Sequence, residues 1–202
     1  MKRLVVKDLS VERGGRHVFE AVSFALSAGE ALVVSGANGA GKSTLLRTLA
    51  GYIKPQAGTI HIEGGDEDAP PGELAHAVGH ADALKPALTV AENITFWAGF
   101  MTGAPGNVDK ALETFGLADL AHVPARVLSA GQRRRLSLAR LMAVRRPLWL
   151  LDEPTTAIDR ASEAVLNEVM RMHLAQGGLV VAATHSPLGL TAPRTLHLGT
   201  AS

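Results

Sequence analysis

The chain contains no cysteine, and this absence excludes a disulfide framework and thiolate metal sites. No apolar run approaches the ~18 to 20 residues that a membrane-spanning helix needs, and the opening MKRLVVKDLSV has too few apolar residues for a signal peptide. A net charge of only +1 gives no general attraction to nucleic acid. We therefore expect any association with a membrane to come through a partner.

The length and the order of segments predict one domain of the α/β class. The chain has 202 residues, of which 47% are apolar, enough for a substantial core. Short apolar strands alternate with helical patterns, which is typical of a parallel sheet flanked by helices. We expect strands at 31–35, 59–62, 148–151 and 179–183, and helices at 42–50 and 162–176.

Within this single domain, residues 1–202, we expect three parts. Residues 1–30 contain two β-rich segments around a glycine turn and predict a small antiparallel sheet. Residues 31–90 and 128–202 form the core, and residues 91–127 form a helical subdomain, with a break at TGAPGN. The acidic stretch 63–73 is predicted to be a surface loop.

The segment GANGAGKST follows a predicted strand and precedes a predicted helix, which is the context of a phosphate-binding loop. Its glycines let backbone N–H groups approach a polyphosphate, the helix N-terminus favours the negative charge, and the lysine reaches the terminal phosphates. The serine hydroxyl would bind Mg²⁺. The sequence therefore predicts a P-loop NTPase fold whose nucleotide is held by Gly36, Asn38, Gly39, Ala40, Gly41, Lys42, Ser43 and Thr44.

Two acidic residues end the apolar segment WLLDEP. Asp152 would lie at the carboxyl edge of the sheet, where ligands gather, and we expect it to hold Mg²⁺ directly or through water. Glu153 would face the γ-phosphate, as general base or as the group that orients the attacking water. An exposed acidic loop is the alternative for this pair.

The string LSAGQ predicts a second anion-binding helix start, with Ser129 as the N-cap and Gly131 leaving room at the backbone. One chain does not need two such sites for one triphosphate. We therefore expect a head-to-tail dimer in which this site closes over the nucleotide of a second copy. The arginines at 133–135 would lie near that seam, although a solvated helix face is the simpler expectation for them.

Together, GANGAGKST, LSAGQ, LLDEP, TTAID and Thr184-His185 resemble the ATP-binding cassette ATPases over essentially the whole chain. The resemblance implies ATP and Mg²⁺ as cofactors and a role for Gln132 beside Ser129 at the partner's nucleotide. It further implies that His185 contacts the γ-phosphate and that Asp159 couples the two halves of the dimer.

Two positions depart from the family pattern. Arg13 stands where the family usually has an aromatic residue that stacks on adenine; a guanidinium can stack in the same way, and a solvated turn arginine is the alternative. His80 stands where the family usually has a glutamine that touches Mg²⁺ and water. Because imidazole is a poor ligand for Mg²⁺, we expect His80 to hold water or sense the partner, or to be an ordinary histidine at the end of a strand.

The text GHADALKPALTVAENITFW and RPLWLLDEPTTAID looks like the ATP-binding subunits of the bacterial haem exporters of cytochrome c maturation. This resemblance implies integral membrane partners, a peripheral place at the cytoplasmic face of the inner membrane, and no direct contact with haem or nucleic acid. The alternative is a soluble cassette ATPase acting on nucleic acid or ribosomes, although the long coiled-coil insertion of that class is not visible. A small-molecule kinase or a guanine-nucleotide switch would leave LSAGQ unexplained.

Overall fold

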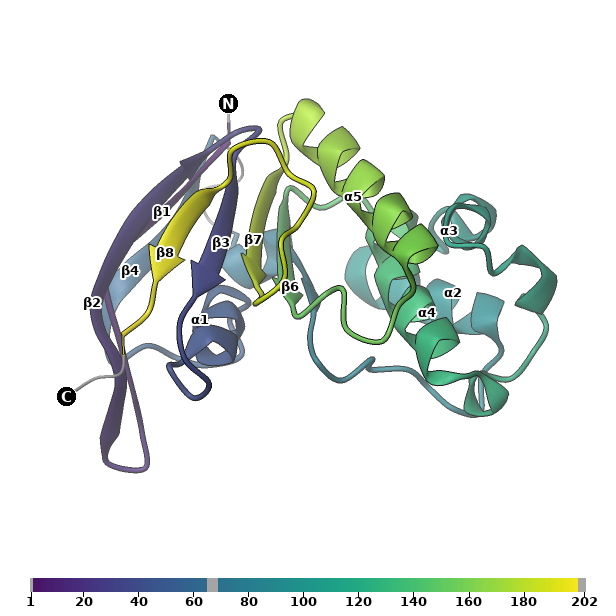
Figure 1. The fold of residues 1–202 in the computed structure, drawn as a ribbon, viewed down its shortest axis with the longest axis horizontal. Coiled ribbons are helices and arrows are strands. Elements are labelled where there is room, and N and C mark those ends of the chain that lie inside the picture. Colours follow the sequence, from purple (N-terminus) through teal and green to yellow (C-terminus); the bar gives the residue numbers. More distant parts are fainter. Residues whose placement is uncertain (1, 65–68, 200–202) are drawn as a thin grey trace.

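The computed structural model describes residues 2–64 and 69–199, and Figure 1 shows its sheets on one side and most of its helices on the other. Its strands are β1 (Arg3–Arg13), β2 (Arg16–Ser27), β3 (Ala31–Ser35), β4 (Ala57–Glu63), β5 (Ala75–Val78), β6 (Leu148–Asp152), β7 (Leu179–Ala183) and β8 (Arg194–His197). Its helices are α1 (Lys42–Leu49), α2 (Val90–Thr102), α3 (Val108–Thr114), α4 (Ala130–Ala143) and α5 (Arg160–Ala175), with 3₁₀ turns at Pro71–Leu74, Ala118–Leu120 and Ala125–Val127. The part of the predicted acidic loop at 65–68 lies outside the described residues.

The core is a parallel sheet in the order β5-β6-β7-β3-β8, which confirms the predicted fold class. Strands β6 and β7 are buried along their whole length, and both of their faces are covered, which is why they are continuously apolar rather than alternating. Successive side chains point to opposite faces, so Leu148 and Leu150 enter one apolar cluster while Trp149 and Leu151 enter the other.

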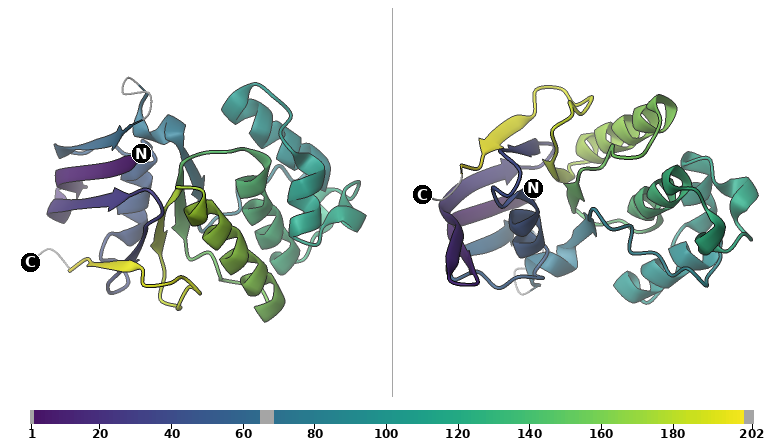
Figure 2. Two further views of the ribbon diagram at one scale, coloured as in Figure 1. Left: turned by 90° about the horizontal axis from the view of Figure 1, so that it is seen from above. Right: turned by 60° about the horizontal axis from the view of Figure 1, so that its bottom comes forward.

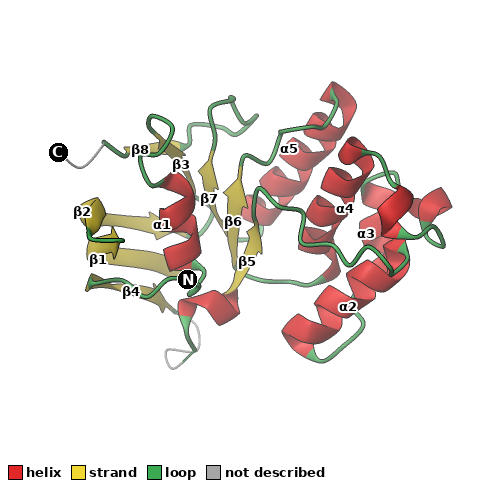
Figure 3. Cartoon of the chain, turned by 90° about the horizontal axis from the view of Figure 1, so that it is seen from below, coloured by secondary structure: helices red, strands yellow, loops and turns green. Residues whose placement is uncertain are grey.

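The two clusters define the layers of the molecule. On one face of the parallel sheet, α5 packs against β7 and α4 against β5, and α2 and α3 pack against α4 farther from the sheet. Helix α1 and the antiparallel sheet cover the other face (Figures 1 and 3). The carboxyl ends of the parallel strands therefore open between the layers, at the edge where the loop after β3 begins.

The antiparallel sheet has the order β2-β1-β4, so its third strand comes from outside residues 1–30. Strand β4, expected with the core, pairs with β1, where Ile62 lies opposite Leu4 and Ile60 opposite Val6. These side chains all contribute to the cluster beneath the sheet. Pairing with β1 buries this apolar face of β4, which explains the difference from the sequence-based assignment. Strand β8, at the edge beside β3, was not expected from the sequence.

The helical layer is also larger than expected, because α4 packs against α2 and α3. Helix α4 brings the buried side chains of Leu138 and Leu141 into the cluster shared with these helices. The helices thus gather residues from 90 to 143 (Figure 2). The helix that follows LSAGQ, expected with the core, therefore belongs to this group of helices as well as contacting the sheet at β5.

Candidate functional site

The predicted phosphate-binding loop connects β3 to α1, as its motif requires. Gly36, Gly39 and Gly41 all have positive φ, at 142°, 84° and 95°. A Cβ at position 36 would collide with the carbonyl oxygen of Leu198, and one at position 41 would lie 2.7 Å from Cγ1 of Val18. Glycine at these two positions is thus required by close packing against β2 and the residue after β8, in addition to any approach by phosphate.

Lys42, the first residue of α1, turns back over this loop. Its Nζ donates hydrogen bonds to the carbonyl oxygens of Gly36 at 2.8 Å and Ala37 at 3.1 Å, and the residue is 9% exposed. The ammonium therefore lies at the concave side of the loop, where the N–H groups at the start of α1 also converge.

His185, which follows β7, reaches the same place. Its Nε2 lies 3.2 Å from Nζ of Lys42, 3.2 Å from Oδ1 of Asn38 and 3.8 Å from Oε1 of Glu153. According to the tautomer, this nitrogen accepts from Lys42 or donates to Asn38. The structure thus brings four residues from three separate predicted motifs into one polar cluster.

Glu153 has an unusual backbone conformation, with φ at 44° in the left-handed region. A non-glycine residue pays a steric cost there and persists only when the surroundings hold it. Its backbone N–H donates to the carbonyl oxygen of Ala183 at 2.8 Å, and its Oε2 accepts from the hydroxyl of Thr184 at 3.3 Å. The carboxylate is thereby directed toward His185, while the preceding Asp152 stays within β6 and is 8% exposed.

A groove of about 740 Å³ lies beside this cluster, and Ser43 and Asp152, the two predicted metal-binding residues, both line it. Hydroxyl and carboxylate oxygens are suitable for Mg²⁺, which usually keeps several waters and substrate phosphates as its other ligands. The donor set therefore fits the metal that the sequence predicts. The outer part of the groove is formed by residues 69–83, by α2, and by arginines of α4 and of the loop after α4.

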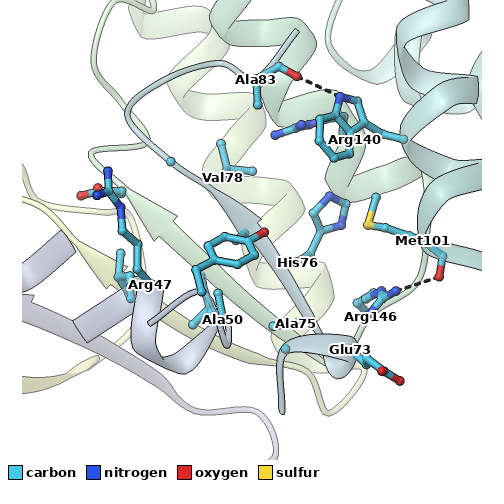
Figure 4. A pocket seen from close by; sticks show the side chains of 18 of the residues that line it. Arg47, Ala50, Glu73, Ala75, His76, Val78, Ala83, Met101, Arg140 and Arg146 are labelled. Atoms are coloured by element: carbon cyan, nitrogen blue, oxygen red, sulfur yellow. Dashed lines mark hydrogen bonds between the residues drawn. The ribbon is translucent and has the colours of Figure 1, made fainter. Parts of the chain in front are cut away.

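The opposite walls of the groove carry different side chains. Figure 4 shows Arg47 and Ala50 on one side, Met101 and Arg140 on the other, and His76 between them. Arg140 is 3% exposed, and burial lowers its pKa to about 10. Burial, followed by the charges of Arg140 and Arg146, lowers the pKa of His76 to about 3, so this histidine is neutral near pH 7. The outer rim includes Tyr52 and Phe100, which are 74% and 76% exposed.

The expectation that residues 133–135 form a solvated helix face is wrong. Arg134 is 4% exposed, and all three guanidinium groups donate to backbone carbonyl oxygens. Position 134 begins an apolar stripe that continues through Leu138 and Leu141, so its spacing on the helix was an available signal. Three consecutive arginines concealed it, because arginine is rarely buried.

The predicted N-cap at Ser129 is confirmed, and it forms a reciprocal capping box with Gln132. A Cβ at Gly131 would lie 3.1 Å from the carbonyl oxygen of Ala157, in the turn before α5. Asp159 caps α5 by accepting from the N–H of Ser162, and this bond lowers the pKa of the Asp159 carboxyl. Among the hydrogen bonds of the described residues, none joins 129–132 to the phosphate-binding loop, and their contact with the nucleotide of a second copy stays a prediction.

The two departures from the family pattern lie at exposed positions. Arg13 ends β1 at the hairpin beside β2, whose Val18 packs under the phosphate-binding loop. His80 follows β5, directly after Gly79, whose carbonyl oxygen accepts from Arg134 at 2.7 Å. Their roles toward adenine and water stay predictions.

Comparisons with known proteins agree with this arrangement. The sequence model described as ABC transporter matches residues 19–156. A solved Pyrococcus furiosus protein, assigned as the ATP-binding protein of an ABC transporter, superposes with a TM-score of 0.82 at 26% identity and covers 97% of both chains. The cytochrome c biogenesis ATP-binding export protein CcmA of Rhodopseudomonas palustris strain BisB5 is 53% identical over 97% of this chain and 98% of its own. The protein of the same name from Bradyrhizobium diazoefficiens is 54% identical over 93% of each.

The fold, the phosphate-binding loop and the cluster around Glu153 define an ATP-hydrolysing subunit of the ATP-binding cassette class, as the resemblance implied. The chain is similar to its relatives along nearly all of its length, including the segments between the motifs. Within that class, it belongs to the family of cytochrome c biogenesis ATP-binding export proteins.

Proposed function

We propose that the chain supplies the ATPase activity of an exporter for cytochrome c maturation, and that the transported or released group is haem. The observation that carries this proposal is the full-length similarity to export proteins of that name, joined to an assembled nucleotide site. The chain itself does not contact haem in this proposal, since it has no cysteine for covalent attachment and its role is hydrolysis.

In the proposed reaction, Lys42 and the N–H groups at the start of α1 bind the phosphates of ATP. Glu153 accepts a hydrogen bond from the attacking water and aligns it with the γ-phosphorus, and His185 donates to a γ-phosphate oxygen. Ser43 and Asp152 would hold Mg²⁺, which when bound neutralises phosphate charge. The hydrogen bond from Thr184 to Glu153 supports this assignment, because it fixes the carboxylate beside His185.

The first proposed partner is a second copy of the chain. Ser129, Gly131 and Gln132 lie at the N-terminus of α4, where the helix dipole favours an anion, and Asp159 lies at the neighbouring helix start. A head-to-tail dimer would bring these residues to the nucleotide of the opposite copy. ATP would then join the two copies and hydrolysis would release them.

The second proposed partner is an integral membrane subunit at the cytoplasmic face of the inner membrane. In the described residues, no helix is long and apolar enough to cross a bilayer. The groove supports this partner, because Tyr52 and Phe100 expose aromatic surface while Arg140 and Arg146 line it without a carboxylate within ion-pair distance among the described residues. We propose that it receives a helix whose apolar residues flank a carboxylate.

Deletion of the gene in its source bacterium tests the proposed export function. We expect loss of covalently haem-bearing periplasmic cytochromes, seen by haem staining, while b-type cytochromes persist. Complementation should succeed with the parent gene and fail with Lys42→Ala. Cytochromes c that mature normally after deletion would contradict the function, and purification of the chain from detergent-solubilised membranes with ribosomes or DNA would favour the alternative class.

The groove is tested separately with Phe100→Cys, which places the only cysteine in the chain. A thiol-reactive photo-crosslinker attached there should capture a segment of a membrane subunit with Asp or Glu within one helical turn of the linked residue. Ser186→Cys, on an exposed loop that does not line the groove, is the matched control. A linked segment without a carboxylate would overturn the groove assignment and leave the ATPase assignment standing.

A further inference from the structure

Arg134 of α4 joins the ends of two core strands through its side chain. Its Nη2 donates to the carbonyl oxygens of Asp152 at 2.9 Å and Glu153 at 2.7 Å, at the end of β6. Its Nη1 donates to the carbonyl oxygen of Gly79 at 2.7 Å, directly after β5, and lies 3.7 Å from Oδ1 of Asp82. Both terminal nitrogens of one guanidinium therefore bind backbone at the catalytic edge of the sheet.

This arrangement places a charge where burial is unfavourable. Burial lowers the pKa of Arg134, while the nearby carboxylates of Asp82 and Asp152 act in the opposite direction. Its Nε has no hydrogen-bond partner in the described residues. Burying a guanidinium with an unpaired N–H destabilises the fold. If residue 134 only filled space, an apolar side chain would be more favourable at this position.

The neighbouring arginines make a different kind of contact. Arg133 donates to the carbonyl oxygen of Leu128, just before its own helix, and Arg135 donates to those of Phe115 and Gly116, just after α3. Both contacts remain within the helical layer. Arg134 alone among the three binds the edge of the parallel sheet that carries Glu153.

The hydrogen bond from Arg134 to the carbonyl oxygen of Glu153 helps to hold the unusual backbone conformation of Glu153. Its N–H is held by Ala183 and its carbonyl oxygen by Arg134, so both sides of a residue with φ at 44° are fixed. Rotation of this residue toward an ordinary φ would swing the carboxylate away from His185 and break one of these two bonds. An error of about 1 Å in the place of a catalytic group can cost ~10²-fold in rate.

We propose that Arg134 is a positioning residue for ATP hydrolysis. It holds the backbone of Glu153 in its left-handed conformation and ties this backbone, with that of Gly79, to α4. Ser129 caps the same helix five residues earlier, at the end that is proposed to meet the second copy. Arg134 therefore links this helix end to Glu153, the residue proposed to orient water. This inference rests on the proposed role of Glu153.

The central experiment compares Arg134→Met, Arg134→Lys and the parent chain in ATP affinity and in kcat and KM for ATP. Methionine keeps much of the apolar stem without donors, whereas the lysine ammonium is a single point that cannot span three carbonyl oxygens. We expect ATP affinity to stay within about threefold. The kcat should fall roughly 10- to 100-fold for methionine and less for lysine. Arg171→Met, at an exposed position of α5 where the arginine pairs with Glu168, is the control and should keep kcat within about threefold.

A double-mutant cycle with Glu153→Gln separates positioning from a general structural effect, using single-turnover rates of ATP hydrolysis. If Arg134 acts through Glu153, Arg134→Met should cause little further loss in the Glu153→Gln background. An equal fold loss in both backgrounds, or a kcat of Arg134→Met or Arg134→Lys equal to the parent's, overturns the proposal. Full activity of Glu153→Gln by itself would instead refute the proposed role of Glu153, so the two failures are distinguishable.

Discussion

Nε2 of His185 lies 3.2 Å from Nζ of Lys42, although 143 positions separate the two residues. Strands β3 and β7 are parallel neighbours, with Val34 opposite Ala183, so the segments that follow them leave the sheet at the same edge. The phosphate-binding loop and the Thr184-His185 pair are therefore adjacent because of strand order.

Lys42→Ala should weaken ATP binding, because it removes the ammonium that lies against the loop and leaves the backbone N–H groups alone with the phosphates. Isothermal titration calorimetry measures the change, which we expect to be at least tenfold in Kd. Lys110→Ala, on the exposed side of α3, is the control and should bind like the parent. Equal affinity of Lys42→Ala and the parent would contradict the phosphate-binding role.

Glu153→Gln should reduce steady-state hydrolysis by 100-fold or more while ATP binding persists, because the amide keeps the shape of the side chain and lacks the carboxylate. We expect the variant to accumulate as an ATP-dependent dimer, seen by size-exclusion chromatography with light scattering. Glu113→Gln, exposed on α3, should hydrolyse normally. Hydrolysis by Glu153→Gln at the parental rate would remove Glu153 from its role.

Ser129→Arg should leave ATP binding to the chain's own loop intact and prevent the dimer, because a long cationic side chain would fill the opposite site. The Glu153→Gln background, in which the dimer should accumulate, makes the effect measurable. Ser129→Asn is the matched control, since asparagine also caps a helix. An ATP-dependent dimer of normal yield in Ser129→Arg would contradict the head-to-tail arrangement.

His80→Gln should retain hydrolysis, because it restores the amide that the family usually has at this position, whereas His185→Ala should be nearly inactive. His80→Ala lacks both the imidazole and the amide, so it should hydrolyse ATP more slowly than either His80→Gln or the parent. If His80→Ala hydrolyses ATP at the parental rate, His80 is an ordinary histidine at the end of a strand.

The free energy of unfolding should decrease as the pH falls below about 6.5. Burial is the first cause that lowers the pKa of His76 from an ordinary 6.5 to about 3, and of His173 to about 4. Between these values and 6.5 the unfolded chain binds protons that the folded chain excludes, which costs about 1.4 kcal/mol per pH unit for each histidine. Urea denaturation at several pH values should show a smaller slope for His76→Leu. An unchanged slope in His76→Leu would contradict the exclusion of the proton by burial of His76.

Much of the fold followed from local patterns. The short apolar segments at 31–35, 148–151 and 179–183 predicted strands, and the structure confirms them as β3, β6 and β7. The capping boxes at Ser129 and Thr89 also depend only on residues three positions apart. The assignment of β4 and α4 to their layers was less accurate, because the pairing partner of a strand and the packing partner of a helix are set by residues far away in the sequence.

The sequence by itself determined the class of the protein. The phosphate-binding loop, the end of β6 and the start of α4 are short segments in which consecutive residues supply the functional groups. Only the tertiary structure decided that Arg134 is buried against the carbonyl oxygens of Asp152, Glu153 and Gly79. The physical reason is that the sequence gives the type of side chain and not its surroundings, so a solvated arginine and a buried one look the same. Its partners here are backbone oxygens, which every residue carries and which no sequence pattern distinguishes.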